Sequence, residues 1–196
     1  KKGSKYQIPN YLNKNKEMYN TKLMENNDKI FVAGHKGMVG SAILRNLRKN
    51  GYNNLMVVDK KDLDLSNKNS VFEWFENFKP DIVIIAAAKV GGIYANNTFP
   101  ADFILNNLKI QNNLIEASLI NKVKRLLFLG SSCIYPKFCD QPIKEEYLLN
   151  GYLEKTNEFY AIAKISGLKL CEALRKQYGF DALTLMPTNL YGPGDN

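Results

Sequence analysis

Short apolar runs alternate with longer amphipathic segments along the chain from Lys29 onward. The runs at residues 29–33, 55–59, 81–88, 125–129 and 182–186 have the length and apolar content of buried strands. The segments at 39–50, 71–78, 100–120 and 157–178 carry apolar residues at helical spacing. Strands that alternate with helices are joined by right-handed crossovers and pair in parallel. The pattern therefore predicts an α/β protein with a doubly wound parallel sheet.

Residues typical of helix ends stand at several of these boundaries. Gly51 and Gly179 follow the first and the last predicted helix, where glycine commonly ends a helix. Pro100 suits the first turn of the third helix, and Ser66 is a candidate N-cap for the second.

The length and composition allow one domain with a polar extension. With 196 residues, of which 45% are hydrophobic and 23% charged, the chain can bury the core of one domain of ordinary size. Residues 1–28 are rich in lysine and asparagine and lack apolar periodicity, so they could not bury enough surface to offset the entropy of ordering. We expect a flexible polar extension at residues 1–28 and one domain at residues 29–196.

The net charge of +8 is not gathered in the way that nucleic-acid binding requires. Residues 1–29 hold seven lysines against three acidic residues, a balance of +4. The rest is spread over the domain without a cluster of basic and aromatic side chains, so we expect no nucleic-acid partner.

Membrane, secreted and metal-binding classes are not supported either. No run approaches the ~20 consecutive apolar residues that a membrane span needs, and no secretory signal pattern is present near residue 1. Three cysteines without a Cys-x-x-Cys pair support neither a disulfide framework nor a zinc site. We expect a protein of the cytoplasm with no membrane partner and no bound metal.

A glycine-rich loop lies between the first strand and the first helix. It consists of Gly34, His35, Lys36, Gly37, Met38, Val39 and Gly40. Backbone N–H groups and the helix dipole at such a helix start can hold a pyrophosphate. The G-x-x-G-x-x-G spacing departs from the G-x-G-x-x-G of many dehydrogenases. The strand before it and the helix after it favour a dinucleotide site over a purely structural turn.

Charges near the expected adenosine ribose bear on which dinucleotide binds. Asp59, at the end of the second strand, is placed to accept from the 2′-hydroxyl of NAD and to repel the 2′-phosphate of NADP. Lys36, Lys60 and Lys61 offer the positive charge that a 2′-phosphate needs. We expect the lysines to outweigh Asp59 and therefore NADP to be preferred over NAD. His35, the only histidine, is interpreted as a polar loop residue rather than a catalytic one.

A phenol and an ammonium share one face of the last predicted helix. Tyr160 and Lys164 are four residues apart, close enough to interact on a helix. We expect the cation to lower the pKa of the phenol from its usual value of ~10, which would suit Tyr160 to act as a general acid. Ser131 stands just beyond the fourth strand, at the sheet edge where ligands of such folds bind.

Five segments, in the same order, resemble those of GDP-L-fucose synthases, which are extended short-chain dehydrogenases with a Rossmann-type sheet. They are GHKGMVGSA at 34–42, AAAKVGGI at 86–93, GSSCIYP at 130–136, YAIAK at 160–164 and MPTNLYGP at 186–193. The resemblance covers residues 29–196 and implies an NAD(P)-binding domain there.

The resemblance also implies a reaction and a set of site residues. The reaction is epimerisation at C3 and C5 and NADPH-dependent reduction at C4 of GDP-4-keto-6-deoxy-D-mannose, carried out by a homodimer packed through its two long helices. By the same resemblance Ser131, Tyr160 and Lys164 serve reduction and Cys133 serves epimerisation. The cofactor would be lined by residues 34–40, by Leu129, Gly130, Ser131, Ser132 and Lys164, and by Pro187, Thr188, Asn189 and Leu190.

The sequence departs from that family pattern in two ways. The usual partner of Cys133 is a histidine shortly after Tyr-Gly-Pro, and this chain stops at Asn196 before any such residue. Most of the C-terminal sugar-binding region is also absent, so we expect an incomplete domain that is inactive alone. At the ribose end, relatives carry arginines near Lys36 and Lys60, and Asp59 is unexpected.

Two other functions fit parts of the pattern. A nucleotide-sugar 4-epimerase or 4,6-dehydratase shares the glycine-rich loop and Tyr-x-x-x-Lys but recycles a tightly held NAD, and it usually lacks a cysteine at the position of Cys133. A dinucleotide-sensing protein without catalysis commonly loses the tyrosine or the lysine, and here both remain. A free cysteine can also be a small buried hydrophobe, which is how we interpret Cys171.

Overall fold

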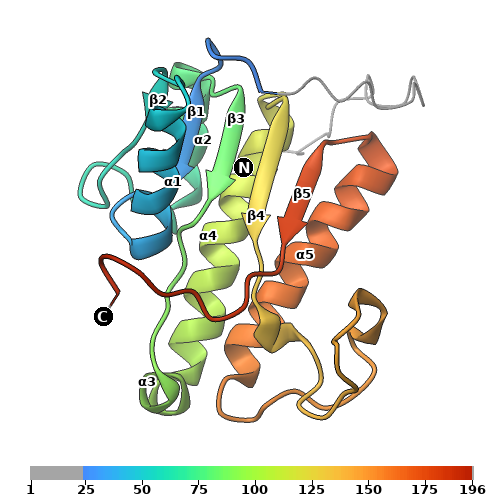
Figure 1. Cartoon of the computed structure of the whole chain (residues 1–196). Helices are drawn as coiled ribbons and strands as arrows, with labels where there is room; N and C mark the ends of the chain where they lie inside the picture. The colour runs from blue at the N-terminus through green and yellow to red at the C-terminus, as the bar shows by residue number, and fades with distance from the viewer. Residues whose placement is uncertain (1–23, 196) are drawn as a thin grey trace, which may run out of the picture.

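Five parallel strands form the centre of the computed structural model, which describes residues 24–195. The strand order is β2-β1-β3-β4-β5, with every neighbouring pair parallel (Figure 1). The strands are β1 (Ile30–Ala33), β2 (Leu55–Met56), β3 (Ile82–Ile85), β4 (Arg125–Leu129) and β5 (Ala182–Leu185). This topology confirms the predicted doubly wound parallel sheet.

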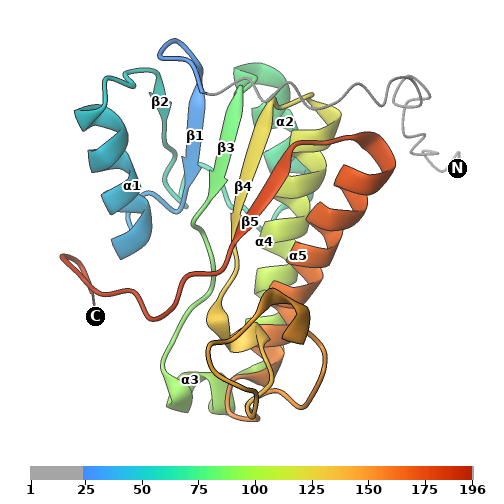
Figure 2. The ribbon, with the colours of Figure 1, turned by 45° about the vertical axis from the view of Figure 1, so that its right-hand side comes forward.

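Helices cover both faces of the sheet. They are α1 (Met38–Lys49), α2 (Lys68–Phe78), α3 (Ile93–Thr98), α4 (Pro100–Ile120) and α5 (Glu158–Tyr178), with 3-10 turns at Ser132–Ile134 and Glu145–Tyr147. Figure 2 shows α1 on one side of the sheet and α2, α4 and α5 on the other. Within residues 24–195, no helix combines the length and apolar content that crossing a membrane requires.

The buried strands supply both layers of the core because successive side chains point to opposite faces. Ile30 and Val32 of β1 pack in one cluster with Leu44 and Leu47 of α1. Phe31, between them, belongs to the cluster under α2, α4 and α5. Strands buried on both faces read as continuous apolar runs, and this is the pattern that identified β1 and β3 in the sequence.

Element bounds agree with the sequence prediction where the apolar pattern is strong and differ at the edges. The predicted bounds of α4 and β4 are confirmed. Strand β2 is two residues long rather than five, because it pairs only with β1 and Val57 is already 42% exposed. Ser66 is not the N-cap of α2: Asn67 accepts from the N–H of Ser70, and Ser66 bonds instead to Asp64. Helix α3 was not predicted.

Close packing of α5 against β4 sets the height of α5 above the sheet. A Cβ on Gly167 would lie 2.6 Å from Cζ of Phe128, so only glycine allows this approach. The amide Nε2 of Gln111, buried on α4, donates to the carbonyl of Ala163 at 2.7 Å. These contacts hold the first half of α5 over the carboxyl end of β4.

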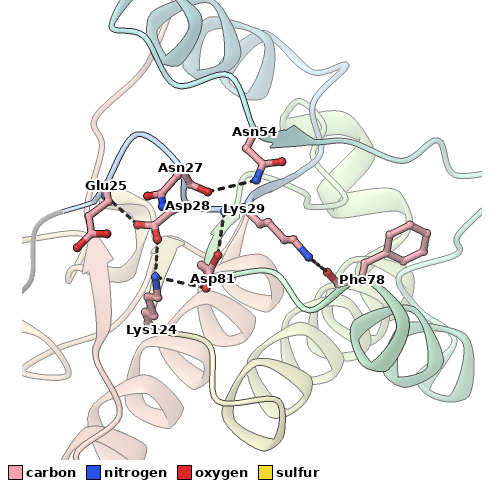
Figure 3. Close-up of polar contacts among 8 residues, drawn as sticks. All are labelled: Glu25, Asn27, Asp28, Lys29, Asn54, Phe78, Asp81 and Lys124. Atoms are coloured by element: carbon pink, nitrogen blue, oxygen red, sulfur yellow. Dashed lines mark hydrogen bonds and ion pairs between the residues drawn. The ribbon is translucent and has the colours of Figure 1, made fainter.

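A network of charged side chains links three segments of the chain at the amino edge of the sheet, opposite the carboxyl edge (Figure 3). The carboxylate of Asp28, 4% exposed, pairs with Nζ of Lys124 at 2.5 Å, and that Nζ lies 3.4 Å from Asp81. Asp81 accepts from the N–H of Lys29 at 3.0 Å, and Asp28 accepts from the N–H of Glu25 at 2.8 Å. Residues 24–28, the last part of the predicted extension, therefore lie against the sheet, and residues 1–23 are outside the described part.

We expect Lys124→Met to lower the free energy of unfolding by about 1–3 kcal/mol, because it removes the cation that pairs with the buried carboxylate of Asp28. Chemical denaturation of the intact protein measures this loss. The double variant Asp28→Asn/Lys124→Met should recover part of it, since the buried charge is then gone. Losses in the two single variants that simply add in the double variant would contradict a coupled pair.

Candidate active site

The glycine-rich loop folds tightly against the turn that follows β3. Gly34 has φ of +87°, and a Cβ there would lie 2.6 Å from the backbone N of Ala87. A Cβ on Gly40 would lie 2.2 Å from the carbonyl oxygen of Gly34. Among the described residues, no side chain caps the start of α1 and its first turn carries no acidic residue. This cradle fits a pyrophosphate, because the positive end of the helix dipole stays open to an anion.

Two nitrogen-bearing side chains of this loop lie against Asp59. Nζ of Lys36 lies 2.6 Å from Oδ2 of Asp59, and Nε2 of His35 lies 3.3 Å from Oδ1. The hydrogen bond from Lys36 lowers the pKa of the Asp59 carboxyl below its ordinary value. Lys60 and Lys61 follow in an exposed turn. The structure thus places Lys36 and His35 against Asp59, and Lys60 and Lys61 directly follow Asp59 in the chain.

The loop after β4 presents Ser131 and Cys133 at the carboxyl edge. The N–H of Gly130 donates to the carbonyl of Leu185 at 2.8 Å, and that of Ser132 donates to the carbonyl of Pro187 at 3.1 Å. Both bonds fasten this loop to the segment that leaves β5. The hydroxyl of Ser131 accepts from the N–H of Cys133 at 3.4 Å, at the start of the 3-10 turn.

Helix α5 adds Tyr160 and Lys164 to the same place. Lys164 is 4% exposed, and its Nζ donates to the carbonyl of Leu129 at 2.7 Å. The same Nζ lies 5.7 Å from the ring centroid of Tyr160 and 4.8 Å from that of Phe128. The four residues proposed as catalytic are therefore neighbours, although they come from two elements some thirty residues apart along the chain.

The expected lowering of the Tyr160 pKa is wrong for this structure. Burial raises the pKa of Tyr160 to about 12, and a negative charge on Cys133 would raise it further. Burial also lowers the pKa of Lys164 to about 8, although a negative charge on Cys133 acts to raise it. The physical reason is that desolvation penalises both the phenolate of Tyr160 and the ammonium of Lys164. The ammonium of Lys164 donates its hydrogen bond to the carbonyl of Leu129 and not to the phenol. Tyr160 is thus held in its protonated form at neutral pH.

The two cysteines of interest lie in different surroundings. Burial raises the pKa of the Cys133 thiol above its usual value, and the bond from Ser131 and the charge of Lys164 offset this in part. Cys171 is a residue of α5 and is 1% exposed, and burial raises its thiol pKa to about 11. The interpretation of Cys171 as a small buried side chain is confirmed.

The segment after β5 runs along the carboxyl edge toward α1 (Figures 1 and 2). It begins at Pro187, beside Ser132, and by Gly194 it has reached the start of α1, where a Cβ on Gly194 would lie 3.9 Å from Cα of Met38. Thr188, Asn189 and Leu190 are exposed on this path. All segments proposed to line a cofactor therefore border one edge of the sheet.

Comparison with known proteins shows which family the chain belongs to. The model of the NAD dependent epimerase/dehydratase family matches residues 30–196. The chain belongs to that family. Among curated members, it is 60% identical over 168 residues to GDP-L-fucose synthase 1 of Arabidopsis thaliana, covering 86% of this chain and 52% of that protein. It is 55% identical over 168 residues to GDP-L-fucose synthase of Escherichia coli strain K12, with 86% and 52% covered.

A solved structure with the same fold carries a bound cofactor. It is the GDP-mannoheptose C4 reductase MlghC of Campylobacter jejuni with NADP bound, with a TM-score of 0.86 and 44% identity. The match covers 89% of this chain and 55% of that one. The chain spans about half the length of the curated epimerase/dehydratase relatives named above.

The sequence analysis did not predict a role for Asn107, a polar residue near the carboxyl edge of the sheet. Asn107, 2% exposed on α4, accepts from the N–H of Lys89 at 2.8 Å and donates to its carbonyl at 2.9 Å. It thereby fixes the turn after β3 against which Gly34 folds. A signal was available: Asn107 lies four residues after the buried Phe103, on the apolar face of the helix where a polar side chain needs partners.

Proposed function

We propose that the intact protein containing this chain is an NADPH-dependent GDP-L-fucose synthase. It converts GDP-4-keto-6-deoxy-D-mannose into GDP-L-fucose by epimerisation at C3 and C5 and reduction at C4. The observation that carries the proposal is the meeting of Cys133 with Ser131, Tyr160 and Lys164 at the carboxyl edge. Two curated GDP-L-fucose synthases at 60% and 55% identity support it.

The proposed epimerisation depends on the ketone at C4, which acidifies the hydrogens at C3 and C5. Cys133 exchanges a proton with the ring carbon on one face, and a second acid/base on the opposite face completes each inversion. In the family pattern, that second group is a histidine shortly after Tyr-Gly-Pro. Hydrogen bonds from Ser131 and Tyr160 stabilise the charge that develops on the ketone oxygen.

The proposed reduction needs a dinucleotide, and the described residues fit one. NADPH, when bound, supplies the hydride for C4. The open start of α1 and the glycine-rich loop would hold its pyrophosphate, and Lys36, Lys60 and Lys61 its 2′-phosphate. Leu129–Ser132 and Pro187–Leu190 would border it, and Lys164 would hold its ribose. Tyr160, protonated at neutral pH, donates the proton that the C4 oxygen takes up.

We also propose a cytoplasmic homodimer packed through α4 and α5. Large apolar side chains on these two helices remain exposed in the single chain, namely Leu105 at 52%, Phe159 at 43% and Ile162 at 39%. A second copy that covers them would bury this surface.

A C4 reductase without epimerisation is the second candidate. The relative MlghC is named a GDP-mannoheptose C4 reductase, and burial raises the pKa of the Cys133 thiol in this chain instead of activating it. A 4-epimerase or dehydratase that retains NAD is disfavoured by the GDP-L-fucose synthase relatives, as is a sensor without catalysis.

The deciding experiment incubates the purified intact protein with GDP-4-keto-6-deoxy-D-mannose and NADPH in deuterated water. We expect GDP-L-fucose that carries deuterium at C3 and C5, detected by NMR, with one NADPH oxidised per product. A reduced sugar without deuterium at these carbons would support the C4 reductase instead. NAD that survives dialysis, with no net oxidation of NADPH, would contradict both.

A further inference from the structure

Among the described residues, enclosed side-chain oxygens without a hydrogen-bond partner occur on Asn96, Asn157 and Asp181. Such atoms are rare in folded proteins, because burial removes their water and nothing replaces it. Two of these side chains are anchored at their other end. Nδ2 of Asn96 donates to the carbonyl of Gly91 at 2.7 Å, and Oδ2 of Asp181 accepts from Arg125 at 2.8 Å. Of the three, only the side chain of Asn157 makes no hydrogen bond with any described residue.

Asn157 is the N-cap residue of α5, a position where a side chain commonly bonds the helix. Its carbonyl accepts from the N–H of Ala161 at 3.0 Å, but its side chain bonds no N–H group of the first turn. Asparagine is preferred at this position because its side-chain oxygen usually accepts from one of these groups. The oxygen of Asn157 does not have this usual role, and it can therefore accept from another donor.

The position of Asn157 on α5 aligns it with the proposed catalytic side chains. Residues three or four positions apart lie on one face of a helix, so Asn157, Tyr160 and Lys164 share a face. Phe159 and Ile162, which are 43% and 39% exposed, lie on a different face. The unpaired amide is therefore on the side of α5 that carries the phenol and the ammonium.

This face of α5 extends beyond the end of β4. Lys164 donates to the carbonyl of Leu129, the last residue of β4, and α5 packs against the 3-10 turn Ser132–Ile134. Tyr160 is about one helical turn nearer the start of α5 than Lys164, and Asn157 is nearly one turn nearer still. Asn157 is thus beyond the strand end, where a sugar ring held at Tyr160 would extend.

The chemistry of the proposed substrate narrows what Asn157 can bind. In GDP-4-keto-6-deoxy-D-mannose, C4 is a ketone and C6 is a methyl group, so the hydroxyls of the hexose are at C2 and C3. The C3 hydroxyl changes its configuration during the proposed epimerisation, whereas the C2 hydroxyl keeps its configuration throughout. A side chain in a fixed position can therefore hold the C2 hydroxyl through every step.

We propose that Asn157 accepts a hydrogen bond from the C2 hydroxyl of the hexose and thereby positions the ring against Tyr160. The proposal rests on the proposed function and adds a substrate-binding residue to that site. The hydroxyl supplies the donor that Oδ1 lacks. Asn157 as a whole is half-buried, so its amide can rotate to meet the hydroxyl when the sugar binds. Hydrogen bonds in active sites often reach their full geometry only in the complex with substrate.

The test compares two sugars in the intact protein, GDP-4-keto-6-deoxy-D-mannose and its 2-deoxy analogue, with oxidation of NADPH as the readout. In Asn157→Ser we expect kcat/KM for the first sugar to fall about three- to tenfold, as for the loss of one neutral hydrogen bond. For the 2-deoxy analogue the fall should be less than about twofold, because the bond is absent in both proteins. Serine is as good an N-cap as asparagine, so the start of α5 should be kept.

Asn150→Ser is the matched control. Asn150 is exposed, seven residues before Asn157, and its Nδ2 donates to the carbonyl of Glu146 at 2.9 Å. We expect kcat/KM for both sugars to equal that of the parent protein. The dissociation constant of NADPH should stay within about twofold of the parent value in both variants, because the proposed bond is to the sugar and not to the cofactor.

An equal fall for both sugars in Asn157→Ser would overturn the proposal, because the asparagine would then support the shape of the site and not the C2 hydroxyl. An unchanged kcat/KM for the first sugar would also overturn it and would leave the proposed function in place. If the parent protein reduces neither sugar, the proposed function itself fails, and this inference fails with it.

Discussion

Tyr160→Phe should lower the turnover of the intact protein by ~10²-fold or more, with the affinity for NADPH nearly unchanged. Phenylalanine keeps the ring and its packing but removes the only proton that this side chain can give. The contact of Lys164 with Leu129 does not involve the phenol oxygen, so the neighbouring geometry should persist. Steady-state rates and NADPH titration of parent and variant provide the comparison.

Tyr178→Phe is a suitable control for this prediction. Tyr178 is at the last turn of the same helix, remote from the carboxyl edge, and its hydroxyl accepts from Gln177. Its loss should leave turnover as in the parent. Turnover in Tyr160→Phe equal to that of the control would remove Tyr160 from the mechanism.

The raised pKa of Tyr160 changes how its proposed role is understood. With a pKa of about 12, the phenol is protonated throughout the neutral range and is ready to donate. The pKa of Lys164, lowered by burial to about 8, means that its positive charge is present below that pH and lost above it. If that charge assists the proton transfer, kcat/KM should fall as the pH rises through the pKa of Lys164.

The strongest sequence signals predicted the fold because they reflect local rules. Doubly buried strands produce continuous apolar runs, and Pro100 and Gly179 stand at helix ends for conformational reasons that hold in any context. The spacing of Tyr160 and Lys164 likewise placed both on one face of α5. Their meeting with the loop after β4 could be inferred from the fold, because parallel strands end at a common edge.

What the sequence could not supply depends on long-range packing. The direction of the Tyr160 pKa follows from how deeply the site is buried, and no residue spacing encodes this. Asp59 and Lys36 are twenty-three positions apart, and they pair because the glycine-rich loop and the turn after β2 bring them together. The hydrogen bonds between Asn107 and Lys89 also depend on how distant segments pack in the fold. The same holds for the contact of Asp28 with Lys124, which are ninety-six positions apart.

Cys133→Ser tests the feature that separates a GDP-L-fucose synthase from a simple C4 reductase. A thiol has an ordinary pKa of ~8.5 and exchanges protons readily at neutral pH, whereas a serine hydroxyl of similar size is a far weaker acid. Burial raises the pKa of this thiol, so the mechanism requires the bound ketone and the nearby Lys164 to favour the proton transfer. The substitution therefore changes acidity while largely preserving shape.

We expect Cys133→Ser to slow the exchange of the C3 and C5 hydrogens with deuterated water by ~10²-fold or more. Hydride transfer to a 4-ketone sugar that needs no epimerisation should change far less, because Ser131, Tyr160 and Lys164 remain. Cys139→Ser is the matched control and should leave both rates as in the parent. Cys139 is half-buried and lies six residues further along the same loop. Exchange at the parent rate in Cys133→Ser would make the thiol a packing residue, and the C4 reductase would then be the better description of this protein.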